Sequence, residues 1–77
     1  MPPMKIDYQQ FGERMMLARR RRKLTQFDIA QRVGVSSSHI SDIERGAAKP
    51  AHHVIVEICT ILDIAEPDAL TVEAGEV

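Results

Sequence analysis

The chain has 77 residues, of which 44% are hydrophobic and 27% charged, and its formal net charge at pH 7 is −1. This length allows one small domain, so we expect a single domain over residues 1–77, with its core at 7–64 and a short helix and acidic tail at 65–77. The single cysteine, Cys59, excludes an internal disulfide and fits a reducing compartment. Because no apolar run reaches the ~18 residues of a membrane span and no signal-peptide pattern is present, the sequence predicts a cytoplasmic protein.

The charges are unevenly distributed along the chain. Residues 1–55 carry ten basic and five acidic side chains, a net charge of +5, whereas residues 56–77 carry six acidic side chains and no basic one. Salt confines the reach of each charge to about 8–10 Å, so the local field matters more than the total. A basic face with an acidic far side suits docking on phosphates from one side.

The first predicted helix begins at Asp7, because Asp7 and Gln10 have the spacing of a capping box. Its inward stripe at helical spacing consists of Tyr8, Phe11, Met15 and Ala18. The basic run 19–23 ends this helix, where cations complement the helix dipole.

Residues 25–46 predict two short helices joined by a glycine turn. Thr25 and Asp28 form a second capping box, and Gly34 is the expected left-handed residue that ends the helix. Ser36 is a good N-cap for the next helix, which Gly46 closes. The predicted inward positions of the two helices are Ile29, Ala30, Val33, Ile40 and Ile43. The outward side of the second helix is a row of short polar side chains, which suits a helix that lies in a DNA groove.

A fourth helix can begin at Pro50 and run to about Leu62, with Asp63 at its end. Its predicted core stripe is Ile55, Ile58, Cys59 and Leu62. Pro67 permits a last short helix at about residues 66–71. The sequence therefore predicts an all-α fold with five helices.

Most of the chain, residues 11–64, resembles the phage-repressor-like helix-turn-helix family (Cro/repressor, XRE type). The matching residues are Leu24-Thr25-Gln26, Ile29-Ala30, Val33-Gly34-Val35-Ser36, Ile40-Ser41 and Ile43-Glu44-Arg45-Gly46, then Pro50 and the apolar run to Ile64. The resemblance implies an all-α, five-helix, lambda-repressor-like DNA-binding domain. Helices 2 and 3 would form the helix-turn-helix, and the second of them enters the major groove in DNA readers.

The resemblance assigns base readout to the start and outer face of the third helix. The corresponding residues are Ser37, Ser38, Ser41 and Asp42, with His39 at the margin. Serine pairs with either donors or acceptors and discriminates weakly between bases. Asp42 can accept from the amino group of cytosine, or it is simply a charge on the helix surface.

Phosphate contacts are implied at the N-terminus of helix 2, where free backbone N–H groups attract anions. The family docks its equivalents of Thr25 and Gln26 there, and further candidates are Ser36, Arg45, Lys49, Arg22 and Lys23. For the run 20–23 a solvated helix end is an equally good interpretation.

The resemblance makes Arg19 a structural partner of Glu44 rather than a phosphate contact. Lys23 stands where the family usually has glycine, and a left-handed backbone there would cost about 1–2 kcal/mol.

The implied function is that of a sequence-specific transcriptional regulator of double-stranded DNA, most simply a repressor that binds an inverted repeat as a homodimer. The predicted dimer interface comprises Val54, Ile61, Ala65 and Leu70, with Val72 beside them. The alternative is an antitoxin-type or other protein-interaction module with a toxin-like partner, which an outward-facing Phe27 favours. A controller protein of a restriction–modification system is a third, related interpretation.

Enzymatic chemistry is not expected. Ser36–Ser38, His39 and Asp42 lie on one short helix, whose side chains point outward and cannot relay a proton toward an oxyanion hole. His52, His53 and Cys59 are too few and wrongly spaced for a structural zinc site. We therefore expect no catalytic residue, no metal and no cofactor.

Overall fold

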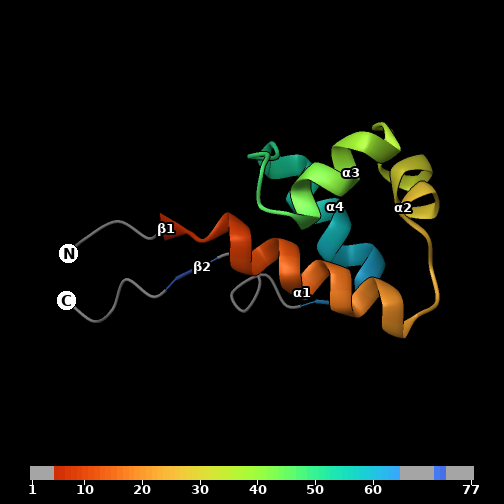
Figure 1. Cartoon of the computed structure of the whole chain (residues 1–77), viewed down its shortest axis with the longest axis horizontal. Coiled ribbons are helices and arrows are strands. Elements are labelled where there is room, and N and C mark those ends of the chain that lie inside the picture. The colour runs from red at the N-terminus through yellow and green to blue at the C-terminus, as the bar shows by residue number, and fades with distance from the viewer. Residues whose placement is uncertain (1–4, 65–70, 73–77) are drawn as a thin grey trace.

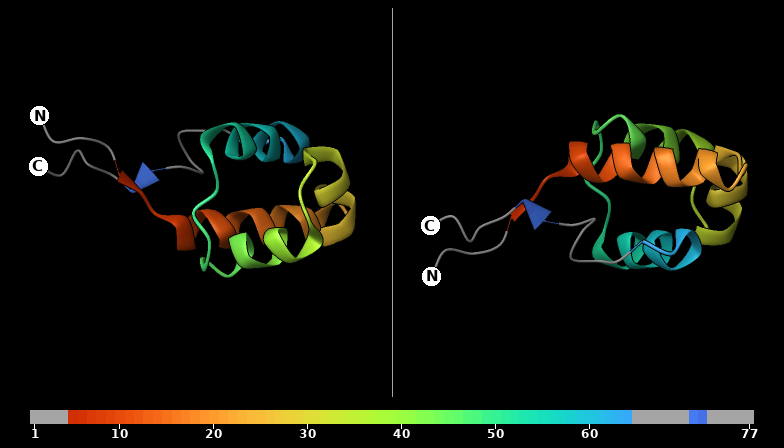
Figure 2. Two further views of the ribbon diagram at one scale, coloured as in Figure 1. Left: turned by 90° about the horizontal axis from the view of Figure 1, so that it is seen from above. Right: turned by 90° about the horizontal axis from the view of Figure 1, so that it is seen from below.

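Four helices and one short pair of strands make up the described part of the computed structural model, residues 5–64 and 71–72. The helices are α1 (Tyr8–Arg21), α2 (Gln26–Val33), α3 (Ser37–Glu44) and α4 (His52–Leu62), and the strands are β1 (Lys5–Ile6) and β2 (Thr71–Val72). Helix α1 packs against α3 and α4, and α2 closes the bundle by packing against the same two helices (Figures 1 and 2). None of the helices described is long and apolar enough to cross a membrane.

Three helices begin at the caps that the sequence predicts. Asp7 accepts a hydrogen bond from the Gln10 backbone N–H at 3.0 Å, and Ser36 accepts one from the His39 backbone N–H at 3.0 Å. Thr25 forms its complete capping box with Asp28. Helix α4 differs, because Pro50 is buried before the helix and Ala51 is an N-cap without a side-chain hydrogen bond.

The helix ends use left-handed residues. Gly34 ends α2 with a φ of 86°, and Gly46 follows α3 with a φ of 75°. Two non-glycine residues adopt the same region, Lys23 with a φ of 59° and Asp63 with a φ of 56°. Lys23, which stands where the family usually has glycine, therefore has the left-handed backbone expected to cost about 1–2 kcal/mol.

The core is aliphatic apart from one aromatic ring. It contains every residue predicted to face inward on α1 to α4, either fully buried or packed against the buried cluster. The fully buried members include Phe11, Met15, Ile40 and Cys59. Val54 was predicted for the dimer interface, but it is only 5% exposed and lies in this core. Helix α4 packs against both α1 and α2, so its buried face is wider than one stripe.

The strands add a feature that the sequence did not predict. Lys5 pairs with Val72 and Ile6 with Thr71 in an antiparallel ladder, which lies beyond the N-terminus of α1 (Figure 1). The predicted helix 66–71 falls on residues outside the described ones except at Thr71, which belongs to β2 and not to a helix. Two-residue strands are too short to show an alternating pattern, so only the tertiary pairing reveals them.

Candidate nucleic-acid interface

Helices α2 and α3 form one tightly connected unit. The Thr25 hydroxyl accepts from the Asp28 backbone N–H at 3.0 Å, and the Asp28 carboxylate accepts from the Thr25 backbone N–H at 2.8 Å. At the other end of α2 the backbone N–H groups of Gly34 and Val35 both donate to the Ala30 carbonyl. These bonds leave little freedom in the turn, so the direction of α3 is fixed relative to α2.

A buried carboxylate joins three helices behind this unit. Glu44 accepts from Nε of Arg19 at 2.6 Å and from Nη2 at 3.1 Å, and its side chain is 3% exposed. The Gln26 amide donates to the same carboxylate at 3.0 Å, and Nη1 of Arg19 donates to the Leu24 carbonyl at 2.8 Å. The predicted pairing of Arg19 with Glu44 is therefore present. The Gln26 side chain was predicted to contact phosphate, but it is turned inward to this network.

The backbones of α1 and α3 touch at Gly12, a feature that the sequence analysis missed. A β-carbon on Gly12 would lie 2.3 Å from the Ile43 carbonyl oxygen and 2.7 Å from that of Glu44. A glycine in the middle of a helix is otherwise unfavourable, so its presence there is the feature of the sequence that could have indicated a close backbone contact. The contact sets how close α3 lies to α1.

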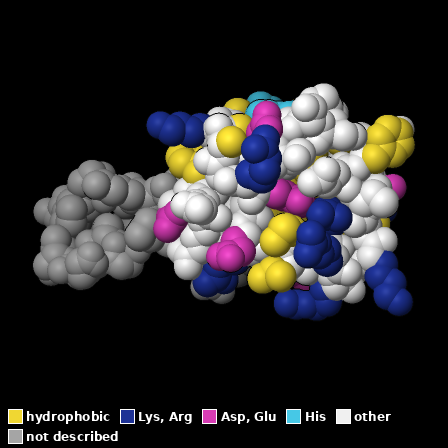
Figure 3. All heavy atoms as spheres, viewed as in Figure 1, with side chains coloured by type: hydrophobic (Ala, Val, Ile, Leu, Met, Phe, Trp, Pro, Cys, Tyr) yellow, Lys and Arg dark blue, Asp and Glu magenta, His cyan; other side chains and the backbone are white. Residues whose placement is uncertain are grey.

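The outward face of α3 gathers all five residues predicted to read bases. Ser38 is exposed, whereas Ser37, His39, Ser41 and Asp42 are partly exposed. The inward face is anchored by Ile40 and Ile43, which are at most 1% exposed. In Figure 3 the surface over α3 is largely white, the colour of the backbone and of side chains that are neither charged nor apolar. Such a surface offers hydrogen-bond donors and acceptors to a ligand.

The two charged side chains at the end of this face are paired with each other. Nη2 of Arg45 donates to Oδ1 of Asp42, three residues earlier in the chain. Both side chains remain accessible, 65% exposed for Arg45 and 42% for Asp42. The residue predicted to contact phosphate and the residue predicted to read a base are therefore coupled.

The N-terminus of α2 is only partly available to an anion. The capping box occupies the backbone N–H groups of Thr25 and Asp28, so Gln26 and Phe27 are left without a carbonyl partner within the helix. The hydrogen bond from the Thr25 backbone, followed by that from its hydroxyl, lowers the pKa of the Asp28 carboxyl below its ordinary value. This carboxylate stays ionised at neutral pH and opposes an incoming phosphate.

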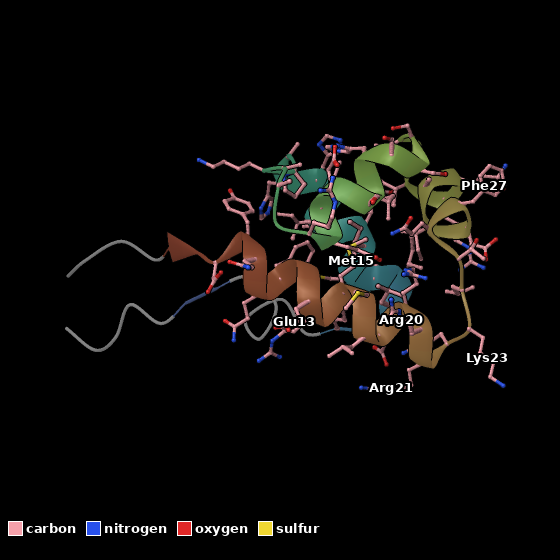
Figure 4. The ribbon with its side chains drawn as sticks, in the orientation of Figure 1. Glu13, Met15, Arg20, Arg21, Lys23 and Phe27 are labelled. Carbon is pink, nitrogen blue, oxygen red and sulfur yellow. The ribbon has the colours of Figure 1, made fainter. Side chains whose placement is uncertain are left out.

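The basic run at the end of α1 divides into residues with different positions. Arg22 was predicted to contact phosphate, but its Nε donates to the Leu62 carbonyl at 3.1 Å and its Nη2 lies 3.9 Å from Asp63. Arg22 therefore caps the end of α4. Figure 4 shows Arg20, Arg21 and Lys23 at the C-terminal end of α1, apart from α3. Lys23 is exposed just before α2, and Lys49 is exposed in the loop after α3.

The residues predicted for protein contacts differ in their exposure. Phe27 is 57% exposed and points outward from α2, as expected (Figure 4). Among the residues predicted for a dimer interface, Val54 is buried in the core and Ile61 is partly buried against it. Ala65 and Leu70 lie outside the described residues, as does the side chain of Val72.

Comparison with known proteins agrees with this geometry. A helix-turn-helix domain family matches residues 10–72. The chain is 35% identical over 52 residues to the uncharacterized HTH-type transcriptional regulator y4dL of Sinorhizobium fredii, a match that covers 68% of this chain and 26% of that protein. It is 29% identical over 66 residues to the uncharacterized HTH-type transcriptional regulator YqaE of Bacillus subtilis, covering 86% of this chain and 57% of that protein. The chain thus spans about a quarter of the first relative and somewhat more than half of the second.

Solved structures share the fold. The restriction-modification controller protein C.AhdI from Aeromonas hydrophila is 28% identical, with a TM-score of 0.73 over 82% of this chain and 96% of that chain. The clp gene regulator ClgR from Corynebacterium glutamicum is 21% identical, with a TM-score of 0.76 over 87% of this chain and 71% of that chain. The match to the family covers most of the sequence and includes the capped α2–turn–α3 unit. The chain belongs to the helix-turn-helix domain family, and within it to the phage-repressor-like (Cro/repressor, XRE) type.

Proposed function

We propose that this domain is a transcriptional regulator that binds double-stranded DNA, with α3 in the major groove. The observation that carries the proposal is the outward face of α3, a continuous row of short polar side chains on a helix whose direction is fixed. Ser37, Ser38 and Ser41 would approach base edges, with His39 at the margin. Because hydroxyl groups discriminate weakly between bases, DNA shape and bridging waters would supply part of the specificity.

Phosphates would anchor the domain on both sides of the groove. The Ser36 hydroxyl accepts a hydrogen bond from the His39 backbone N–H and still carries a proton to donate. The Thr25 hydroxyl accepts from the Asp28 backbone N–H and would turn its proton from the Asp28 carboxylate to a phosphate. The exposed ammonium groups of Lys23 and Lys49 would add long-range attraction. Gln26 would contribute its backbone N–H rather than its side chain.

We further propose that the domain forms a homodimer that binds an inverted repeat and represses transcription by occluding a promoter. A dimer places two recognition helices in successive major grooves, about 34 Å apart on one face of the duplex. Ile61, Ala65 and Leu70 are the proposed interface, now without Val54.

Selection of binders from a random duplex pool tests the proposal. We expect an enriched inverted repeat, and a much higher affinity for it than for a scrambled duplex. Log affinity should fall steeply with log salt concentration, because phosphate contacts release counterions. Light scattering with and without the selected duplex measures the stoichiometry. Binding that salt abolishes equally for both duplexes would contradict sequence-specific reading, and a monomer on DNA would contradict the dimer.

A protein-interaction module is the second candidate, and the exposed ring of Phe27 favours it. An antitoxin-type protein would use such a surface for a toxin-like partner. Phe27→Ser distinguishes the two functions, because it should abolish capture of a co-expressed partner while leaving affinity for the selected duplex unchanged.

A role as a restriction–modification controller is a narrower version of the regulatory function, supported by the likeness to C.AhdI. A neighbouring endonuclease gene under control of the selected repeat would identify it.

A further inference from the structure

We propose that Asp42 and Arg45 act as one unit that reads a single G·C base pair in the DNA bound by α3. This inference rests on the proposed function and specifies which base pair the surface selects. It also changes the role expected for Arg45, from a general phosphate contact to one half of a reading pair.

The first observation is where the pair lies. Asp42 is on the outward face of α3 beside Ser38 and Ser41, and Arg45 is the C-cap residue of the same helix. The other charged residue within α3, Glu44, is turned inward and held by Arg19 and Gln26. The Asp42–Arg45 pair therefore supplies the full charges that α3 presents outward.

The second observation is that the pair has little structural use. Its partners are three residues apart on one helix and both are substantially exposed to water. Exposed pairs of this kind contribute little to stability, because water screens the charges and two long side chains lose freedom. Among the bonds found in the described residues, each side chain contacts only the other, so the second Asp42 oxygen and most guanidinium N–H groups can bind a ligand.

The chemistry of the pair matches one base pair. In the major groove, guanine presents N7 and O6 as acceptors, and cytosine presents its N4 amino group as a donor beside O6. The Arg45 guanidinium can donate to guanine N7 and O6, and the neighbouring Asp42 carboxylate can accept from the cytosine amino group. The two side chains together complement this row of atoms. An A·T pair offers the adenine N6 donor in place of guanine O6 and the thymine O4 acceptor in place of the cytosine amino group, and so satisfies the two side chains poorly.

The pairing also removes an electrostatic obstacle. A lone carboxylate in the groove would be repelled by the phosphates on both sides. The neighbouring guanidinium cancels that charge, so Asp42 can approach a base edge. The serines beside it discriminate weakly, and the sharpest base preference along α3 should therefore occur at the position that this pair contacts.

The test starts from the duplex selected by the unaltered protein. Each position of one half-site is replaced by all four base pairs, and fluorescence anisotropy gives the affinity of Asp42→Asn, Arg45→Lys and the double variant. Arg45→Lys keeps the charge but loses the planar fork. Lys49→Ala is the matched control, an exposed cation in the loop that follows α3. The three substituted side chains are at the surface, and circular dichroism verifies that each variant folds.

We expect the unaltered protein to prefer G·C at one position of the half-site by about 5- to 150-fold, the range that one bidentate contact implies. Both single variants should reduce that preference at the same position and leave the others unchanged. The double variant should lose no more than either single one. Lys49→Ala should weaken all duplexes equally and lower the salt slope by about one.

Two results would overturn the proposal in different ways. If Arg45→Lys and Asp42→Asn leave every base preference unchanged, the pair does not read a base, and the proposed function still stands. If the unaltered protein enriches no motif from the pool, the proposed function fails as well.

Discussion

The α-carbon of Gly12 faces the main-chain carbonyl of Ile43 so closely that a β-carbon on Gly12 would lie 2.3 Å from that oxygen. Helix α1 therefore packs on the backbone at the end of α3, without an intervening side chain. This contact lies next to Glu44, whose carboxylate binds Arg19 from the same helix α1. The position of the recognition helix thus depends on a glycine outside the helix-turn-helix.

Gly12→Ala is expected to lower the free energy of unfolding by about 1–3 kcal/mol, because the added methyl group forces α1 away from α3. Alanine is favoured over glycine in a helix by about 1 kcal/mol, so a loss of stability would reveal the steric cost directly. Urea unfolding followed by circular dichroism measures the change. Glu13→Ala, at the neighbouring exposed position, is the control and should change stability little. A more stable Gly12→Ala variant would contradict the close approach.

Arg19→Ala is expected to destabilise the protein by about 3–5 kcal/mol, because it leaves Glu44 buried without its counter-charge. Glu44→Leu should cost a comparable amount, since it leaves the guanidinium unpaired. The double variant Arg19→Ala/Glu44→Leu should lose much less than the two single losses together, because no buried charge remains. Chemical denaturation of the unaltered protein, the two single variants and the double variant gives the free energies of unfolding for this double-mutant cycle. Additive losses would mean that the two side chains do not interact.

Local features of the fold were predictable because their physical signals are local. Caps such as Thr25 and Ser36 and the left-handed Gly34 are determined by residues within four positions of each other, so the sequence indicates them directly. The core stripes follow from helical periodicity for the same reason. The family resemblance supplied the pairing of Arg19 with Glu44, which periodicity alone does not indicate.

Features that depend on packing between distant segments were not predictable. Val54 was predicted to lie at a dimer interface, but the contact of α4 with two helices buries it. Arg22 was interpreted as a phosphate contact, although its guanidinium reaches a carbonyl on α4. The position of a long, flexible side chain depends on its surroundings in three dimensions. Charge and sequence position therefore identified candidates for the interface but could not select among them.

Lys23→Gly is expected to raise the free energy of unfolding by up to about 1 kcal/mol. Removing the β-carbon relieves about 1–2 kcal/mol of left-handed strain, and the greater freedom of glycine in the unfolded chain offsets part of the gain. Arg20→Gly is the matched control, because it removes the same charge from a helical position and should cost about 1 kcal/mol. Thermal unfolding at equal ionic strength compares them. Equal destabilisation by both substitutions would contradict the conformation found at Lys23.

The capping box should give the protein an acid-sensitive contribution to stability. The pKa of Asp28 is lowered in the folded state by its hydrogen bonds with Thr25, so the ionised form stabilises the fold. This contribution is complete above the ordinary aspartate pKa of about 3.9 and is lost as the pH falls through the lower folded-state value. The stability difference between the unaltered protein and Asp28→Asn should therefore shrink below about pH 4. A difference that stays constant from neutral to strongly acidic pH would contradict this assignment.

The same carboxylate should weaken DNA binding at neutral pH. Asp28 lies at the N-terminus of α2, where the proposed interface receives a phosphate, and its negative charge opposes that phosphate. Asp28→Asn keeps an oxygen that can accept from the Thr25 backbone but removes the charge. We expect it to bind every duplex about two- to five-fold more tightly, with base preferences unchanged. Glu57→Gln, which removes a charge from an exposed position on α4, should leave affinity almost unchanged. If both substitutions raise affinity equally, the gain reflects net charge alone, and α2 does not lie against the phosphates.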